Sequence, residues 1–201
     1  MNSAPTEDGA GVSAELPRVI VFDLDGTLWN PEMYQLYGGS PFRSHAHNPS
    51  IMIDKSGEEV KLIGESRVVL QTLSTDLKWA NTYLAISSTC DEPSWARELL
   101  GKFTFTDRTG KGVPMHALFG DRIEIYKANK ARHHEAILQK VNKIDPSVSS
   151  YAQMLFFDNQ TDNVHHVSRI GVTSYHCPSG MTNGTFERGL KMWEKAQTSK
   201  M

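Results

Sequence analysis

Residues 19–29 read VIVFDLDGTLW, and this stretch decides the fold. Its first four residues, Val19 to Phe22, are all apolar, which is typical of a strand covered on both faces, as in a parallel sheet. Asp23 and Asp25 follow at the carboxyl end of this strand. Ligands of open α/β sheets bind outside the carboxyl ends of the strands, so we expect a functional site here. Two carboxylates at a strand end suit a hard cation.

The rest of the chain alternates between strand-like and helix-like apolar patterns. Further strands are predicted at residues 83–86, 122–126, 154–157 and 172–175. Such alternation favours right-handed crossovers, so we predict a doubly wound α/β fold of the Rossmann type with a mostly parallel sheet. Apolar residues recur at helical spacing between the strands, at Val69 and Leu73, at Ala96, Leu99 and Leu100, at Ile137, Leu138 and Val141, at Val164 and Val167, and at Phe186, Leu190 and Trp193.

Two internal segments do not fit this alternation. Residues 29–61 are rich in Gly, Pro, Ser and His and are too long for an ordinary strand-to-helix loop, so we expect a flap or hairpin over the site and no large cap domain. Residues 102–120 are similarly irregular and are predicted to be a surface insertion. Residues 1–17 are small, polar and acidic, and we expect them to be a disordered tail before one domain at residues 18–198.

The composition is that of an ordinary globular chain, with 39% hydrophobic and 22% charged residues among 201. Lys and Arg number 21 against 23 Asp and Glu, so no net positive charge favours nucleic acid or an anionic membrane as a partner. No apolar run approaches the ~20 residues needed to span a bilayer. Two cysteines, Cys90 and Cys177, and the lack of a secretory signal pattern indicate a reducing, cytoplasmic compartment.

Polar residues follow the other predicted strands as well. Ser87 and Ser88 follow the second strand, Asp158 follows the run at residues 154–157, and Lys130 opens a helical pattern. Taken alone, these features have ordinary explanations. Asp25-Gly26 is a common turn pair, and Asp or Ser after a strand often caps a helix. Their joint placement at strand ends favours a site for metal and phosphate instead.

These motifs resemble the haloacid dehalogenase (HAD) superfamily, and within it the small, capless members of the magnesium-dependent phosphatase family. The resemblance runs from about Arg18 to Ala196 and includes VFDLDGTLW, Pro41-Phe42, AISST, EIYKANK, MLFFDNQTDN and GVTSYHCPSGMT. It implies a HAD-like fold and a Mg²⁺-dependent phosphomonoesterase that acts through an aspartyl phosphate. Its substrate is expected to be a small-molecule phosphate ester or a phosphoprotein, since phosphotyrosine, sugar phosphates and fructosamine phosphates all suit an open site.

The resemblance also implies a role for each residue of the site. Asp23 is the expected nucleophile, and Asp25 the general acid and then the general base. Mg²⁺ is expected to bind Asp23, the backbone carbonyl of Asp25, and Asp158. Lys127 competes with Lys130 for the phosphate but is expected to be a solvated charge. The phosphate oxygens need surrounding donors, for which the candidates are the Leu24 amide, the Ser87 hydroxyl, Ser88 and Lys130.

Three positions depart from the pattern of the family. Gly26 stands where an aromatic residue is more frequent, and Ser88 where a basic residue is frequent. Asn159 stands where a second acid is more frequent, which leaves open whether Asn159 or Asp162 supports the outer shell of the metal.

The paired histidines lack the spacing of metal ligands. We expect structural or surface roles for them, with His45 and His47 nearest the substrate because they lie on the flap. The remaining pairs are His133 with His134 and His165 with His166.

Two other functions stay open. A phosphotransferase or mutase uses the same scaffold, although the absence of a large cap domain argues against it. A non-catalytic phosphate-binding interaction module is expected to lack Asp23 or Asp25, and both are present.

The C-terminal Ser199-Lys200-Met201 is a close variant of the tripeptide that peroxisomal import receptors bind. The alternative is a frayed C-terminus in a cytosolic enzyme.

Overall fold

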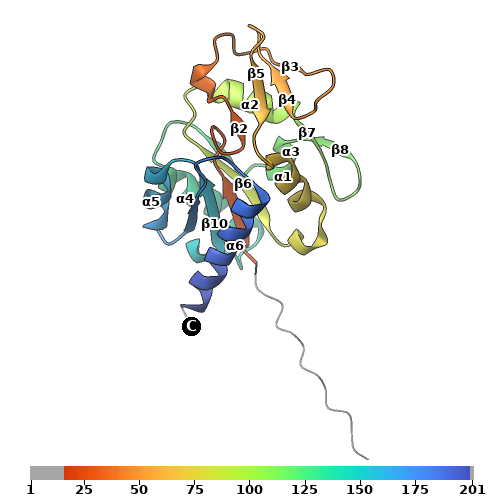
Figure 1. Ribbon diagram of the computed structural model, residues 1–201. Helices are drawn as coiled ribbons and strands as arrows, with labels where there is room; N and C mark the ends of the chain where they lie inside the picture. The colour runs from red at the N-terminus through yellow and green to blue at the C-terminus, as the bar shows by residue number, and fades with distance from the viewer. Residues whose placement is uncertain (1–15, 200–201) are drawn as a thin grey trace, which may run out of the picture.

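The computed structural model describes residues 16–199 of the chain (Figure 1). At its centre lies a five-stranded sheet whose neighbouring strands are all parallel, in the order β11-β10-β1-β6-β9. The predicted doubly wound α/β fold is therefore confirmed. The strands are β1 (Val19–Phe22), β6 (Tyr83–Ser88), β9 (Ile123–Ile125), β10 (Met154–Asp158) and β11 (Thr173–His176).

Helices cover both faces of this sheet. On one face lie α4 (Lys130–Ile144) and α5 (Thr161–Ser168). The other face carries four helices, α1 (Ser66–Thr75), α2 (Pro93–Lys102), α3 (His116–Phe119) and α6 (Asn183–Thr198). Three short 3₁₀ helices complete the described helical elements, at Met33–Gln35, Leu77–Trp79 and Tyr151–Gln153.

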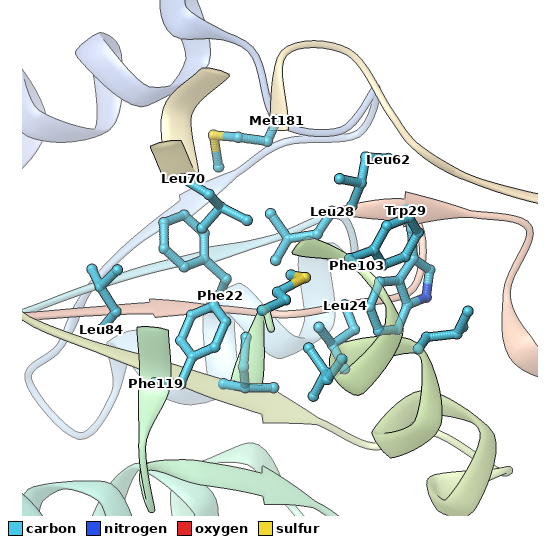
Figure 2. Packing of buried hydrophobic residues seen from close by; sticks show 14 of the residues in the cluster. Phe22, Leu24, Leu28, Trp29, Leu62, Leu70, Leu84, Phe103, Phe119 and Met181 are labelled. Carbon is cyan, nitrogen blue, oxygen red and sulfur yellow. The ribbon is translucent and has the colours of Figure 1, made fainter. Parts of the chain in front are cut away.

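Successive residues of β1 enter two separate hydrophobic clusters. Val19 and Val21 pack with α4 and α5, whereas Ile20 and Phe22 pack with the helices on the opposite face. All four side chains are fully buried, which explains why the strand is a continuous apolar run. Figure 2 shows that the cluster with Phe22 continues past the end of β1 to residues such as Leu24, Leu28 and Trp29. The segment that carries the aspartates is thus anchored in the core on both sides.

The segment predicted as a flap holds a second, antiparallel sheet in the order β2-β5-β4-β3. Figure 1 shows this sheet at the top, above the large sheet. Glu98 of α2 ties it to the rest of the protein, because its carboxylate accepts hydrogen bonds from the Ser40 hydroxyl at 2.6 Å and the Phe42 amide at 2.8 Å. The strands are β2 (Trp29–Asn30), β3 (Arg43–Ser44), β4 (Ile51–Ile53) and β5 (Glu59–Leu62).

Residues 102–120, predicted to be an irregular surface insertion, are mostly exposed as expected but are not irregular. The segment forms a hairpin of β7 (Thr104–Thr106) and β8 (Gly112–Pro114), followed by α3. It contributes to the core, because its large apolar side chains are buried. A hairpin of three-residue strands and a one-turn helix are too short to show a hydrophobic period in the sequence. The buried side chains are Phe103, Phe105, Met115 and Phe119.

Most of the predicted tail, residues 1–17, lies outside the described residues. Of its last two residues, Leu16 packs against the core, and the Pro17 carbonyl accepts a hydrogen bond from the Thr82 hydroxyl at 2.9 Å. At the other end, the last two residues of the Ser199-Lys200-Met201 tripeptide also lie outside the described part. Within residues 16–199, no helix is both long and apolar enough to cross a membrane.

Candidate active site

The sheet brings the ends of three strands together, because β1 lies between β6 and β10. Asp23 follows β1, and its amide donates a hydrogen bond to the Phe157 carbonyl of β10 at 3.0 Å. Ser87 and Ser88 end β6, and Asp158 ends β10. These residues are 64 or more positions from Asp23 in the chain, and only the parallel pairing of the strands makes them neighbours.

The ammonium group of Lys130 joins these strand ends into one buried charged cluster. Its Nζ contacts the carboxylate of Asp23, lies 2.9 Å from Asp158 Oδ2, and donates to the Ser87 carbonyl at 2.6 Å. The three hydrogens of the ammonium group therefore each have an acceptor. The side chain of Lys130 is only 1% exposed and that of Asp158 is fully buried, so solvent screens this cluster little.

The cluster changes the protonation of its members. Burial raises the pKa of Asp23 to about 7, and the neighbouring Asp158 carboxylate adds to this, whereas the Lys130 charge opposes it. Burial lowers the pKa of Lys130, but the two carboxylates outweigh burial and leave this pKa above its ordinary value. Two buried carboxylates held by one ammonium group form a place where a further positive charge is favourable.

Thr27 fixes the second oxygen of Asp23. Its hydroxyl lies 3.2 Å from Asp23 Oδ2 and accepts a hydrogen bond from the Asn159 amide at 3.0 Å. Gly26 has a φ of 74°, and a Cβ at this position would lie 2.2 Å from Asn159 Nδ2. Gly26 and Asn159, two of the departures from the family pattern, thus occupy complementary space, since Asn159 fills the volume that a larger residue 26 needs.

Asn163, which the sequence analysis did not select, holds the carboxylate of Asp158. Its Nδ2 lies 3.0 Å from Asp158 Oδ2, and the amide of Gln160 donates to Oδ1 at 2.7 Å. Asp162 is exposed, and the Asn159 side chain faces Thr27. The expectation that Asn159 or Asp162 supports the metal is not matched by contacts to Asp158. This role of Asn163 depends on how α5 packs against the end of β10, which the sequence pattern does not show.

Asp25 is held by the residues that begin the flap. The indole Nε1 of Trp29 donates to Asp25 Oδ1 at 2.6 Å, and the backbone amide of Met33 donates to Oδ2 at 3.0 Å. Burial raises the pKa of Asp25, and these two hydrogen bonds oppose the shift. A carboxyl group that keeps its proton above the ordinary range suits a general acid. Neither Trp29 nor Met33 was predicted from the sequence to have this role.

A hollow of about 210 Å³ opens over Asp23 and Asp25, the two aspartates that follow β1. This volume is small for a ligand site and suits a phosphoryl group with a compact leaving group. His45 and His47, expected nearest the substrate, line a different hollow together with Lys102 and do not line this one. The hollow over Asp23 and Asp25 is lined by Asp23, Asp25, Glu32, Tyr34, Ser88, Thr89, Cys90, Asp91, Asn159, Gln160 and Asn163.

Three other predicted residues, Leu24, Ser87 and Lys127, do not line this hollow. The Leu24 side chain is buried, and its carbonyl accepts hydrogen bonds from the amides of Thr27, Leu28 and Trp29, which form the turn beside Asp25. Lys127 is a solvated charge as predicted, since its side chain is 87% exposed and pairs with an exposed aspartate. The Ser87 hydroxyl, in contrast, is buried and lies 3.1 Å from Nδ1 of His133.

The carboxylates suit a hard cation such as magnesium. Among residues 16–199, no group of three or more His, Cys, Asp or Glu side chains is arranged to hold a metal ion. Mg²⁺ prefers oxygen ligands, keeps several waters, and often takes only one or two carboxylates. Asp23 and Asp158 supply two buried carboxylates that meet at one positive charge, and Asp23 also lines the hollow.

Fold and site together define the class of this protein. Its central sheet is parallel, DLDGT follows the first strand, and a lysine lies between the aspartates at two strand ends. This combination is typical of a HAD-superfamily phosphatase. The model of the family described as Acid Phosphatase matches residues 15–196, so this chain belongs to that family. The resemblance stated from the motifs is thereby confirmed.

Individual known proteins agree with this membership. The human protein named Magnesium-dependent phosphatase 1 is 33% identical over 185 residues, 92% of both chains. A HAD-like hydrolase superfamily protein of Schizosaccharomyces pombe is 28% identical over 159 residues, 79% of this chain and 84% of that protein. A solved structure, the N-terminal part of a Bacteroides fragilis protein that contains a phosphatase domain complexed with Mg, has a TM-score of 0.50 and 16% identity. The match covers 89% of this chain and 40% of that one, and shows the fold.

Proposed function

We propose that this protein is a Mg²⁺-dependent phosphomonoesterase that works through an aspartyl phosphate on Asp23. The observation that carries the proposal is the buried cluster of Asp23, Lys130 and Asp158 beside the hydrogen-bonded carboxyl group of Asp25. A nucleophile and a proton donor two residues apart at one strand end are the two groups that ester cleavage requires. Magnesium appears in the names of a human relative and of a similar structure.

In the first step, Asp23 attacks phosphorus. A carboxylate oxygen of Asp23 forms a bond to phosphorus while the bond from phosphorus to the ester oxygen breaks. The leaving oxygen takes the proton from Asp25, whose pKa is raised by burial. Trp29 and Met33 hold the Asp25 carboxyl group in place for this transfer. When bound, Mg²⁺ supplies the positive charge that lets the anionic phosphate approach a carboxylate.

In the second step, a water molecule hydrolyses the aspartyl phosphate. Asp25, now ionised, takes a proton from the water as its oxygen attacks phosphorus. The bond from phosphorus to the Asp23 oxygen breaks, which releases inorganic phosphate and restores both aspartates. Thr27 keeps the Asp23 carboxylate oriented throughout, since its hydroxyl lies 3.2 Å from Oδ2.

The equatorial oxygens of the phosphoryl group need hydrogen-bond donors. We assign this role to the Leu24 amide, to Ser87 and Ser88, and to Lys130. Ser88 lines the hollow directly, whereas Lys130 contacts the nucleophile from its buried side. Lys130 already uses its three hydrogens, so it contacts phosphate by exchanging one of its present acceptors.

The lining of the hollow favours one class of ester. Among the described residues that line it, none is Lys or Arg, and its carboxylates include Glu32 and Asp91 besides the two catalytic aspartates. A second anionic group on the leaving group therefore meets like charge. Monoesters with a neutral or cationic leaving group, such as phosphotyrosine, sugar phosphates and fructosamine phosphates, fit better than bisphosphates.

Two alternatives are less well supported. A phosphotransferase or mutase has to exclude water from the aspartyl phosphate, and the flap here consists of four strands of two to four residues over an open hollow. A non-catalytic phosphate-binding module has no need of the hydrogen bonds that hold Asp25.

Hydrolysis of para-nitrophenyl phosphate tests the proposal. We expect turnover in Mg²⁺, loss of at least about 100-fold after EDTA, and full recovery when Mg²⁺ is restored, because the metal supplies several kcal/mol of charge stabilisation. Thermal unfolding in EDTA is the control, since an unfolded protein also loses activity. Unchanged turnover in EDTA contradicts the metal dependence, and absence of turnover in Mg²⁺ contradicts the enzyme.

Organisation and address are further parts of the proposal. We propose that residues 18–198 fold as one domain with residues 29–61 as its flap, and that Ser199-Lys200-Met201 binds a peroxisomal import receptor in addition to a cytoplasmic location. Imaging of an N-terminally tagged protein with and without residues 199–201 tests the address. A punctate signal that becomes diffuse on deletion supports it, and the same diffuse signal from both removes it.

A further inference from the structure

His133 of α4 lies between the phosphate-binding end of β6 and the strand beside it. Its Nδ1 lies 3.1 Å from the Ser87 hydroxyl oxygen, and its Nε2 lies 3.1 Å from the backbone carbonyl of Tyr126. The ring is fully buried and meets the Tyr126 ring edge-on at a centroid distance of 4.3 Å. Both ring nitrogens therefore have a fixed partner, and the ring orientation is determined.

The two partners decide which nitrogen carries the proton. A backbone carbonyl only accepts hydrogen bonds, so Nε2 of His133 must carry a hydrogen that it donates to Tyr126. In a neutral imidazole, Nδ1 is then an acceptor, and the Ser87 hydroxyl must donate its single hydrogen to it. In this state the Ser87 hydroxyl can only accept further hydrogen bonds and has no hydrogen left for a phosphate oxygen.

We propose that His133 is a positioning residue that aims the Ser87 hydroxyl, and that the Ser87–His133 pair makes the site bind a phosphate group together with one additional proton. The inference rests on the proposed function, since it concerns the same phosphate site. Two routes satisfy the hydrogen bonds, and both add one proton to the complex of protein and phosphate. Either Nδ1 of His133 gains the proton, donates to Ser87, and frees the hydroxyl for phosphate, or the phosphate keeps a proton and donates it to Ser87.

The surroundings keep His133 neutral when no phosphate is bound. Burial lowers the pKa of His133 to about 4, and the nearby Lys130 charge adds to the decrease. Arg132 acts in the same direction, whereas the Glu124 carboxylate of β9 opposes it, although Lys140 pairs with that carboxylate at 2.6 Å. Tyr126 faces the ring with its carbonyl and its aromatic edge. A dianionic phosphate brings the negative charge that favours an added proton.

The test is calorimetric titration with inorganic phosphate in saturating Mg²⁺, between pH 6.5 and 8.5. His133→Gln places an amide near the Nε2 position, where it still donates to Tyr126, but it removes the acceptor for Ser87. Without that acceptor the hydroxyl is free to donate to phosphate, and no extra proton is needed. We expect the ratio of the wild-type Kd to the variant Kd to rise about tenfold per pH unit above the second pKa of the ligand, since one proton separates the two proteins.

Two further proteins separate this role from a structural one. His134→Gln is the matched control, because His134 is equally buried and neighbouring but bonds only to the Lys130 carbonyl, so it should keep the wild-type slope. In Ser87→Ala the added change His133→Gln should no longer alter the slope, because the hydroxyl is gone. A purely structural defect weakens binding equally at every pH.

Parallel pH dependence in wild type and His133→Gln overturns the inference. If His133→Gln does not fold, wild type and Ser87→Ala are titrated in two buffers of different ionisation enthalpy, and equal proton uptake overturns it instead. Phosphate binding is measured without turnover, so the outcome is separate from that of the proposed function. Absence of both hydrolysis and phosphate binding refutes the proposed function, and the inference with it.

Discussion

Asp23→Asn is expected to lower kcat by about 10⁴-fold or more, because it removes the nucleophile of the proposed reaction. The amide has nearly the volume of the carboxylate. Its oxygen still accepts from Lys130, and its NH₂ group can donate to the Thr27 hydroxyl. The buried cluster also retains Asp158 as a partner for the ammonium group. The fold should therefore persist, and the loss should appear in turnover rather than in thermal unfolding.

Asp162→Asn makes the same chemical change on an exposed residue of α5 and is the matched control. We expect its kcat to stay within about twofold of the parent, since surface substitutions rarely matter. Steady-state hydrolysis of para-nitrophenyl phosphate and a thermal melt are measured on the three proteins. If Asp23→Asn keeps activity within tenfold of the parent, the nucleophile is a different residue.

Asp25→Asn is expected to lower kcat by about 10²- to 10⁴-fold, the usual contribution of a general acid and base. Hydrolysis of the aspartyl phosphate needs the base. With a substrate whose leaving group is as good as para-nitrophenol, this variant should therefore also accumulate phosphoprotein. Rapid acid quench followed by mass spectrometry measures the phosphoprotein. A variant that turns over like the parent contradicts the role of Asp25.

Trp29→Phe is the comparison that separates the position of Asp25 from its presence. The ring is buried and stacks on Phe103 at 6.2 Å, so phenylalanine keeps much of the packing but loses the 2.6 Å hydrogen bond to Asp25. In the parent protein the hydrogen bond from Trp29 lowers the pKa of Asp25, so its loss should raise this pKa further. A general acid must be protonated, so the alkaline limb of kcat/KM should move to higher pH while kcat falls about tenfold. An unshifted limb shows that Asp25 is not the acid.

Much of the fold and of the candidate site was predictable because it depends on local patterns. The apolar run of β1 requires two covered faces, and the structure has α4 on one side and α6 on the other. A parallel sheet gathers the carboxyl ends of its strands, so Asp23, Ser87 and Asp158 had to meet at one edge. Lys130 rather than Lys127 enters the cluster. That choice followed from the resemblance, because spacing alone left both lysines open.

The contacts that hold these residues in place were decided by the tertiary structure. The Asn159 amide meets Thr27 across 132 positions of the chain, and the Ser87 hydroxyl meets His133 across 46. Hydrogen-bond partners depend on the direction of each side chain after packing, which no local period encodes. For the same reason α5 turns Asn163 rather than Asp162 toward Asp158, and Phe103 and Phe119 enter the core. The sequence thus determined which strand ends meet and which charges they carry, whereas packing determined which neighbour aims each catalytic group.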